Sequence, residues 1–226
     1  MDNRLSYSLI DNIVDFICDR IIEGKFTPGQ KLPEVSISKE LGVSRGSIRE
    51  AFIKLEAVWM VENIPRKGCF VKRFSDEDVS SFFLLFRLLM QSATQQIDVN
   101  GKRSQFMNLE IMGKEFVSSS VGGLQLTKLI PVYRALAGLC MDEVLSQSVL
   151  NLLPAIRRFS AETTAQNLNI GSAKQWLEFV SAVETSDHRK VWELVSTTID
   201  QHQAIIQGEL VKAGETSGSR ETLACV

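Results

Sequence analysis

Apolar residues recur at steps of three and four positions over most of the chain, a spacing that is typical of amphipathic helices. The first such segment spans about residues 7–23 and stops at Gly24. A shorter segment begins after Pro33 and stops at Gly42. Ser44 can then cap a third segment, because a serine hydroxyl accepts hydrogen bonds from amides at a helix start. The apolar residues that share one face of this third helix are Ile48, Ala51, Phe52 and Leu55.

A different pattern follows the third helix. Met60–Ile64 and Cys69–Val71 are short β-prone runs, and Pro65-Arg66-Lys67-Gly68 lies between them. A short turn between two such runs indicates a β-hairpin, here with a basic tip. Three helices followed by a hairpin predict a winged helix-turn-helix over residues 1–74.

Beyond Phe74 only helical periodicity remains. The helices predicted there cover residues 76–96, 103–119, 124–140, 143–166, 172–185 and 188–212. Residues 75–213 are therefore expected to form an all-α helical bundle, and the small, polar residues 214–226 a disordered tail. The predicted fold class is mainly α, with an N-terminal winged helix-turn-helix and a C-terminal all-α bundle.

Composition narrows the class of protein. Hydrophobic residues make up 44% of the 226 residues, which is enough for a core without disulfides. The four cysteines have no CxxC or Cys/His spacing, so reduced thiols are expected. The N-terminus lacks the pattern of a secretion signal, and no apolar run approaches the roughly 18 residues that a membrane-spanning helix requires. These features predict a cytoplasmic protein with no membrane partner.

Charge is distributed unevenly along the chain. The formal net charge is −2, but residues 39–73 hold eight basic and four acidic residues. A local excess of positive charge on an acidic protein is the pattern expected of a nucleic-acid-binding face.

Arg45 and Arg49 lie one helical turn apart at the start of the third helix. The third helix of a winged helix-turn-helix fits the major groove of DNA, and an arginine fork can bond a guanine edge or a phosphate. Ser44, Ser47 and the free amides of the helix start suit phosphate oxygens. Two exposed arginines alone would more often be ordinary surface charge. The turn, the cap, the basic hairpin and the local charge together favour DNA binding.

The segment "KLPEVSISKELGVSRGSIREAFIKLEAVWMVENIPRKGCFV" resembles the N-terminal domain of GntR-family bacterial transcription regulators. The resemblance rests on Leu-x-Glu, Leu-Gly-Val-Ser-Arg, Arg-Glu-Ala, a Leu-Glu pair and Gly-x-Phe-Val, and it covers about residues 7–73. It implies double-stranded DNA as the partner. The DNA-contact residues that it implies are Arg45, Ser47, Arg49 and Gly68, with Ser44, Arg66 and Lys67 as helpers.

The chain departs from the family pattern at two places. Gly46-Ser47 replaces the usual Thr-Pro or similar pair, which is expected to loosen the start of the recognition helix. Trp59 replaces a glycine that usually follows this helix, and a left-handed backbone at that position would strain the tryptophan.

The C-terminal part is similar to the FadR branch of the family, whose members carry the helical ligand-sensing domain called FCD. The best match is "WLEFVSAVETSDHRKVWELVSTTIDQHQ". Many such domains bind a divalent metal through an aspartate and three histidines, and only His202 matches that set here. The other three positions hold Leu129, Tyr133 and Trp176, so the metal site is expected to be lost and no cofactor is expected.

If a pocket persists in this bundle, it would suit an anion or a partly apolar effector. The residues that the resemblance implies for it are Arg87, Tyr133, Arg134, Trp176 and His202. Two alternatives remain open: Trp176 fills the pocket and leaves a domain for dimerisation alone, and His202 is a core histidine held by a hydrogen bond.

These patterns predict a homodimeric regulator that binds a short inverted repeat. An enzyme is not expected, because the sequence has no paired-carboxylate motif, no phosphate-binding glycine loop and only two histidines. A helical protein-interaction module is the third alternative.

Overall fold

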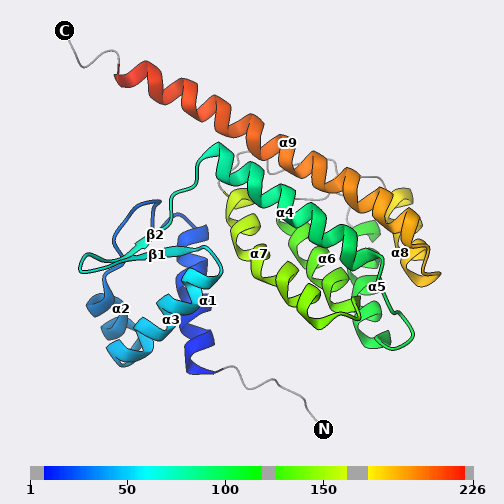
Figure 1. The fold of residues 1–226 in the computed structure, drawn as a ribbon, viewed down its shortest axis with the longest axis horizontal. Helices are drawn as coiled ribbons and strands as arrows, with labels where there is room; N and C mark the ends of the chain where they lie inside the picture. Colours follow the sequence, from blue (N-terminus) through cyan, green and yellow to red (C-terminus); the bar gives the residue numbers. More distant parts are fainter. Residues whose placement is uncertain (1–7, 119–125, 162–172, 222–226) are drawn as a thin grey trace. The chain divides into compact units, whose positions relative to one another are not determined.

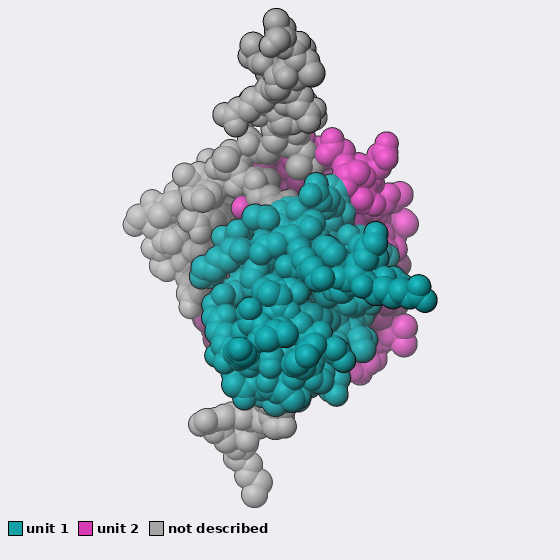
Figure 2. Space-filling view, turned by 90° about the vertical axis from the view of Figure 1, so that its left-hand side faces the viewer, with its two compact units in different colours: residues 1–74 teal, residues 75–226 magenta. Residues whose placement is uncertain are grey.

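The computed structural model describes residues 8–118, 126–161 and 173–221 of the chain (Figure 1). The chain divides into two compact units, residues 1–74 and 75–226, which are coloured separately in Figure 2. Its elements are mainly helices, with a single two-stranded sheet in the described residues. The predicted class, a winged helix-turn-helix followed by a helical unit, is therefore confirmed.

The first unit contains three helices and a hairpin. Their bounds are α1 Leu9–Ile22, α2 Glu34–Leu41, α3 Arg45–Ala57, β1 Val61–Ile64 and β2 Gly68–Val71. The strands are antiparallel and pair Val61 with Val71 and Ile64 with Gly68. The apolar face predicted for the third helix is buried against α1, since helical spacing places its residues on one side.

Local signals fix where these helices start and stop. Ser8 accepts a hydrogen bond from the amide of Asp11, and the Asp11 carboxylate accepts one from the amide of Ser8, which closes a capping box at the start of α1. Gly42 has a φ of 64° and ends α2 in a left-handed conformation that a glycine adopts at little cost. The turn between α2 and α3 therefore follows directly from sequence.

The hairpin is joined to the segment that precedes α2. The amide of Leu32 donates to the carbonyl of Cys69 at 2.9 Å, and the amide of Gly29 donates to the carbonyl of Val71 at 2.8 Å. The amide of Val71 donates in return to the carbonyl of Gln30 at 2.9 Å. These bonds fix the hairpin relative to the start of α2, so the two cannot move independently.

The second unit is a bundle of helices. Their bounds are α4 Asp76–Thr94, α5 Arg103–Ser118, α6 Leu126–Leu139, α7 Glu143–Ala161, α8 Ala173–Glu184 and α9 His188–Glu221. Helix α4 lies between α9 and the α6–α7 pair, and contacts all three (Figure 1). Its residues Phe83, Phe86 and Met90 are fully buried there. None of the helices in the described ranges is long and apolar enough to cross a membrane.

Helix α9 extends further than the sequence predicts. The pattern places its end near residue 212 and a disordered tail over 214–226, whereas the structure continues the helix to Glu221. Extending an existing helix adds one hydrogen bond for each residue that is fixed, so it needs no apolar periodicity. Residues 222–226, like the part of the predicted 143–166 helix beyond Ala161, lie outside the described residues.

Trp59 adopts the left-handed backbone that the family's glycine at this position implies. Its φ is 65°, and its amide donates to the carbonyl of Glu56 at 3.0 Å. The Lys72 ammonium lies 5.4 Å from the centre of its half-exposed ring. The left-handed conformation destabilises a residue that has a Cβ by roughly 1–2 kcal/mol, whereas glycine adopts it without this strain. The strain expected at this departure from the family pattern is therefore present.

Replacement of Trp59 separates the backbone strain from the ring contact. We expect Trp59→Gly to be more stable than Trp59→Ala by about 1 kcal/mol, because both lose the ring and only glycine relieves the left-handed strain. Urea denaturation followed by circular dichroism measures the difference. Equal stability of the two variants would show that the left-handed backbone carries no cost.

Candidate nucleic-acid interface

The start of α3 is capped by its own serines. The amide of Ser47 donates to Oγ of Ser44 at 3.0 Å, and the two hydroxyls lie 2.9 Å apart. The helix begins at Arg45, so the Gly46-Ser47 pair does not delay its start. The expected loosening is therefore not seen in the helix bounds, because the serine cap fixes the first turn.

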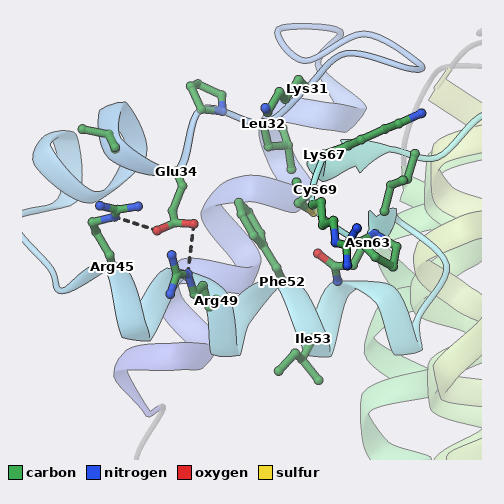
Figure 3. A pocket seen from close by; sticks show the side chains of 16 residues that line it. Lys31, Leu32, Glu34, Arg45, Arg49, Phe52, Ile53, Asn63, Lys67 and Cys69 are labelled. Carbon is green, nitrogen blue, oxygen red and sulfur yellow. Dashed lines mark hydrogen bonds and ion pairs between the residues drawn. The ribbon is translucent and has the colours of Figure 1, made fainter.

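Arg45 and Arg49 project from this capped end into a shared ion pair. Their side chains are 58% and 64% exposed. Nε of Arg45 lies 2.7 Å from one carboxylate oxygen of Glu34, and Nε of Arg49 lies 3.1 Å from the other (Figure 3). The two guanidinium groups therefore lie on one exposed side of α3, as the sequence predicts.

Glu34 is the glutamate of the Leu-x-Glu motif, and the sequence pattern assigned it no role at the DNA. It is the first residue of α2, and its side chain is 21% exposed. Burial tends to raise its pKa, but hydrogen bonds from Arg45 and Arg49 outweigh burial and lower the pKa below its ordinary value. The carboxylate is therefore ionised at neutral pH and bridges the two arginines. Its only sequence signal is its place in the Leu-x-Glu motif.

The hairpin tip is a tight turn built on two left-handed residues. Arg66 has a φ of 64° and Gly68 a φ of 109°, and the amide of Lys67 donates to the carbonyl of Ile64 at 3.0 Å. Residues 66–68 are all exposed. A Cβ at Gly68 would lie 3.0 Å from the side chain of Lys31, so glycine also allows a close approach here.

A groove of about 940 Å³ lies between the start of α2, α3 and the hairpin. Phe52 points into it from α3 (Figure 3). The basic residues that line it are Lys31, Arg45, Arg49, Arg66 and Lys67, and Gly68 also lines it. Glu34 is the one acidic residue of this lining. The structure thus brings five of the seven predicted DNA-contact residues to one basic groove, adds Lys31, and leaves Ser44 and Ser47 at the helix start beside it.

Two of the residues expected in an effector pocket are packed together in the core of the second unit. The rings of Tyr133 and His202 are stacked with centres 6.2 Å apart, and both are fully buried. Nε2 of His202 lies 2.8 Å from Oγ of Ser160. The Tyr133 hydroxyl and Nδ1 of His202 are buried without a hydrogen-bond partner. His202 is therefore a core histidine, held through one of its two ring nitrogens.

Burial also sets the protonation state of this pair. It lowers the pKa of His202 to about 3 and raises the pKa of the Tyr133 phenol. Both side chains are therefore neutral near pH 7. Phe83 and Phe86 pack edge-on against them, with ring centres 5.2 Å from His202 and 4.9 Å from Tyr133.

The charged residues expected in that pocket lie elsewhere. Arg87 forms an ion pair with Asp200 and lies 5.7 Å from the Trp192 ring. Arg134 is exposed. Both guanidinium groups keep contact with solvent, and Arg87 also has an acidic partner, since burial of a charge without a partner is costly. The structure therefore does not bring Arg87 and Arg134 to Tyr133 and His202.

Trp176 packs on Phe179 of its own helix, with ring centres 5.2 Å apart. Leu129 is buried. A leucine and a tryptophan supply no ligand for a first-row metal, and the His202 imidazole is surrounded by aromatic rings. Within the described ranges, no three His, Cys, Asp or Glu residues are close enough to hold a metal ion.

Comparison with known proteins gives the same picture of the first unit. Residues 9–71 match the family of bacterial regulatory proteins called the gntR family. The chain is 26% identical over 133 residues to the HTH-type transcriptional regulator YdhC of Bacillus subtilis, and the match covers 59% of each chain. It is 30% identical over 81 residues to the HTH-type transcriptional regulator Rv1152 of Mycobacterium tuberculosis, a match that covers 35% of this chain and 67% of that one.

The fold of most of the chain is also found in a solved structure. A GntR regulator from Rhodococcus sp. RHA1 superposes with a TM-score of 0.65 at 21% identity, and the match covers 88% of this chain and 97% of the other. At this identity the likeness concerns the fold alone. The family is identified by the match over residues 9–71 and by the sequence shared with Rv1152. The chain belongs to the gntR family of bacterial regulatory proteins, which are transcriptional regulators and not enzymes.

Proposed function

We propose that this protein is a cytoplasmic transcriptional regulator that binds a short inverted repeat in double-stranded DNA as a homodimer. The observation that carries the proposal is the basic groove between α3 and the hairpin, where cationic side chains from three segments line one surface. DNA carries a negative charge about every 1.7 Å along its axis, so such a surface attracts it. An acidic substrate would not need cations spread over a helix start and a hairpin tip.

The geometry supports specific roles for these residues. Arg45 and Arg49 project from the capped start of α3, and the start of a recognition helix is the part that meets base edges in the major groove. Ser44 and Ser47 lie at the amides of the helix start, which suit a phosphate oxygen. The hairpin tip suits contacts with the DNA backbone next to the major groove, through Arg66, Lys67 and Gly68.

An exposed apolar stripe on α4 supports dimerisation through the second unit. Leu84, Leu85 and Leu88 lie on one face of the helix and are 60%, 47% and 53% exposed. Three exposed leucines at this spacing are costly in water unless another surface covers them. A second copy of the chain would present the same stripe, as a two-fold interface requires.

The second unit also has a feature that supports effector binding. The rings of His202 and Tyr133 are stacked, and within the described residues Nδ1 of His202 and the Tyr133 hydroxyl are buried without a partner, although buried polar atoms usually have one. A small, partly apolar molecule with a donor and an acceptor would satisfy both groups if the bundle opened to admit it. The neutral state of both residues, and the place of Arg87 and Arg134 at the surface, disfavour an anion in that position. A bundle that serves dimerisation alone is the alternative.

Native mass spectrometry of freshly purified protein tests the proposal. We expect a species of twice the chain mass, and two chains bound to one duplex that carries an inverted repeat selected from a random pool. The complex should dissociate as the ammonium acetate concentration rises, because phosphate contacts release counterions. A single chain per duplex would contradict the dimer, and no complex at low salt would contradict DNA binding. A co-purified small molecule would favour the effector over dimerisation alone.

A further inference from the structure

We propose that Glu34 determines DNA specificity in this protein by holding Arg45 and Arg49 in one fixed orientation toward the bases. The inference rests on the proposed function. It assigns Glu34 an indirect role, in which Glu34 affects DNA recognition by holding the two arginines and not by contacting DNA. Glu34 acts as a positioning residue, because a carboxylate in a groove for DNA repels phosphate and cannot itself serve as an anchor.

Among the described residues, the contacts of Arg45 and Arg49 with Glu34 use Nε and not the reading edge of either arginine. Glu34 contacts both arginines through Nε, at 2.7 Å for Arg45 and 3.1 Å for Arg49. A guanidinium group has five N–H donors, and Nε supplies only one of them. The two terminal nitrogens of each arginine form the planar fork that fits the O6 and N7 atoms of guanine. Glu34 therefore holds the inner edge and leaves the outer edge for a base.

Glu34 can hold the arginines because it is itself fixed. It is the first residue of α2, and its amide donates to the carbonyl of Leu32 at 3.0 Å. The amide of Leu32 is in turn bonded to the carbonyl of Cys69 in the hairpin at 2.9 Å. The carboxylate thus connects α3 to a segment that is already tied to the hairpin. The arginines and the hairpin tip keep a constant spacing as a result.

The charge of Glu34 adds a second effect. Two arginines alone would carry two positive charges, and the carboxylate offsets one of them. A mobile arginine is satisfied by any phosphate oxygen, which every DNA sequence offers. Glu34 therefore weakens binding to random sequence and favours binding where both arginines meet the correct bases. Specificity is the difference between these two affinities.

Two variants of Glu34 separate these effects. Glu34→Gln removes the charge and the ion pairs, whereas Glu34→Asp keeps the charge but is too short to reach both Nε atoms at the present backbone spacing. Glu40→Gln is the matched control, because it makes the same charge change on α2 at a residue that pairs with Arg20 and does not line the groove. Fluorescence anisotropy measures the affinity of each full-length variant for the selected operator and for a random duplex of equal length.

We expect Glu34→Gln to bind the random duplex more tightly, by about threefold, with a steeper salt dependence by about one unit of slope. Its affinity for the operator should fall by about tenfold, since the arginine forks are no longer oriented. Glu34→Asp should lose operator affinity without gaining affinity for the random duplex. Glu40→Gln should leave the ratio of the two affinities unchanged.

Other outcomes overturn the inference. If Glu34→Gln tightens both complexes equally, Glu34 contributes charge alone. If both Glu34 variants weaken both complexes and lower the melting temperature together, Glu34 has only a structural role. If the wild-type protein binds no duplex, the proposed function is wrong. If the wild-type protein selects an operator and the Glu34 variants keep the same specificity, only the inference about Glu34 is wrong.

Discussion

Alanine at both Arg45 and Arg49 is expected to abolish measurable preference for the operator while leaving the protein folded. Each arginine that reads a base through both terminal nitrogens contributes about 1–3 kcal/mol of discrimination, or roughly 5- to 150-fold in affinity. Both side chains are well exposed, and their only described ion-pair partner is Glu34 at the groove, so the core does not depend on them. Circular dichroism should therefore show wild-type helix content.

The measurement is a salt titration of operator binding for the two single variants and the double variant. The slope of log K against log salt should fall by about one for each phosphate contact that is lost, and by less where an arginine contacts only bases. Lys54→Ala is the matched control, because Lys54 is a cation on α3 that pairs with Asp11 at 2.8 Å and does not line the groove. Its effect on operator affinity should be within about twofold, as for a distant surface charge. Equal losses in Lys54→Ala and Arg49→Ala would contradict a specific role for the groove.

Helix starts and turns were predictable from the sequence because their causes are local. Ser44 and Ser75 each accept a hydrogen bond from an amide three residues later, so the sequence marks the starts of α3 and α4 to the residue. The left-handed φ of Trp59 was instead expected from the resemblance, because the family usually has a glycine at that position. Where the cause lies within one turn of chain, the pattern is sufficient.

Contacts between elements were not predictable by the same route. Glu34 reaches Arg45 and Arg49 across 11 and 15 residues, and the distance depends on the angle that the turn at Gly42 sets between α2 and α3. Lys31 reaches the groove through the pairing of its segment with the hairpin. Residue spacing predicts neither the ion pairs of Glu34 nor the position of Lys31, because both depend on how the elements pack.

The second unit shows the same limit for charged side chains. Helical spacing puts His202 on the same face of α9 as Val195 and Ile199, and all three residues are buried. Helical spacing did not predict the ion pair between Arg87 and Asp200. A long side chain at the edge of an apolar face can extend toward the core or toward solvent. Periodicity predicts which backbone positions face the core, and the cost of burying charge decides where the side-chain ends lie.

The buried His202 is expected to make the second unit sensitive to mild acid. Its pKa is about 3 in the folded chain, where burial disfavours the charged ring, and 6.5 is the ordinary value for an exposed histidine. Below pH 6.5 the unfolded chain therefore binds a proton that the folded chain does not. The contribution of His202 to the free energy of unfolding is therefore complete above about pH 6.5. It decreases by about 1.4 kcal/mol for each pH unit as the pH falls from 6.5 toward 3.

Urea denaturation at pH 7, 6 and 5 measures this dependence. Between pH 7 and pH 5 the wild-type protein should lose about 2 kcal/mol of unfolding free energy from this group. His202→Gln keeps a polar group near Ser160 but cannot titrate, so its stability at neutral pH should be lower while its fall between pH 7 and pH 5 should be much shallower. His188→Gln is the control, because His188 bonds the carbonyl of Thr94 at the start of α9 and is only half-buried. That variant should retain the acid sensitivity of the wild type, and a His202→Gln variant that also retains it would show that another group causes the effect.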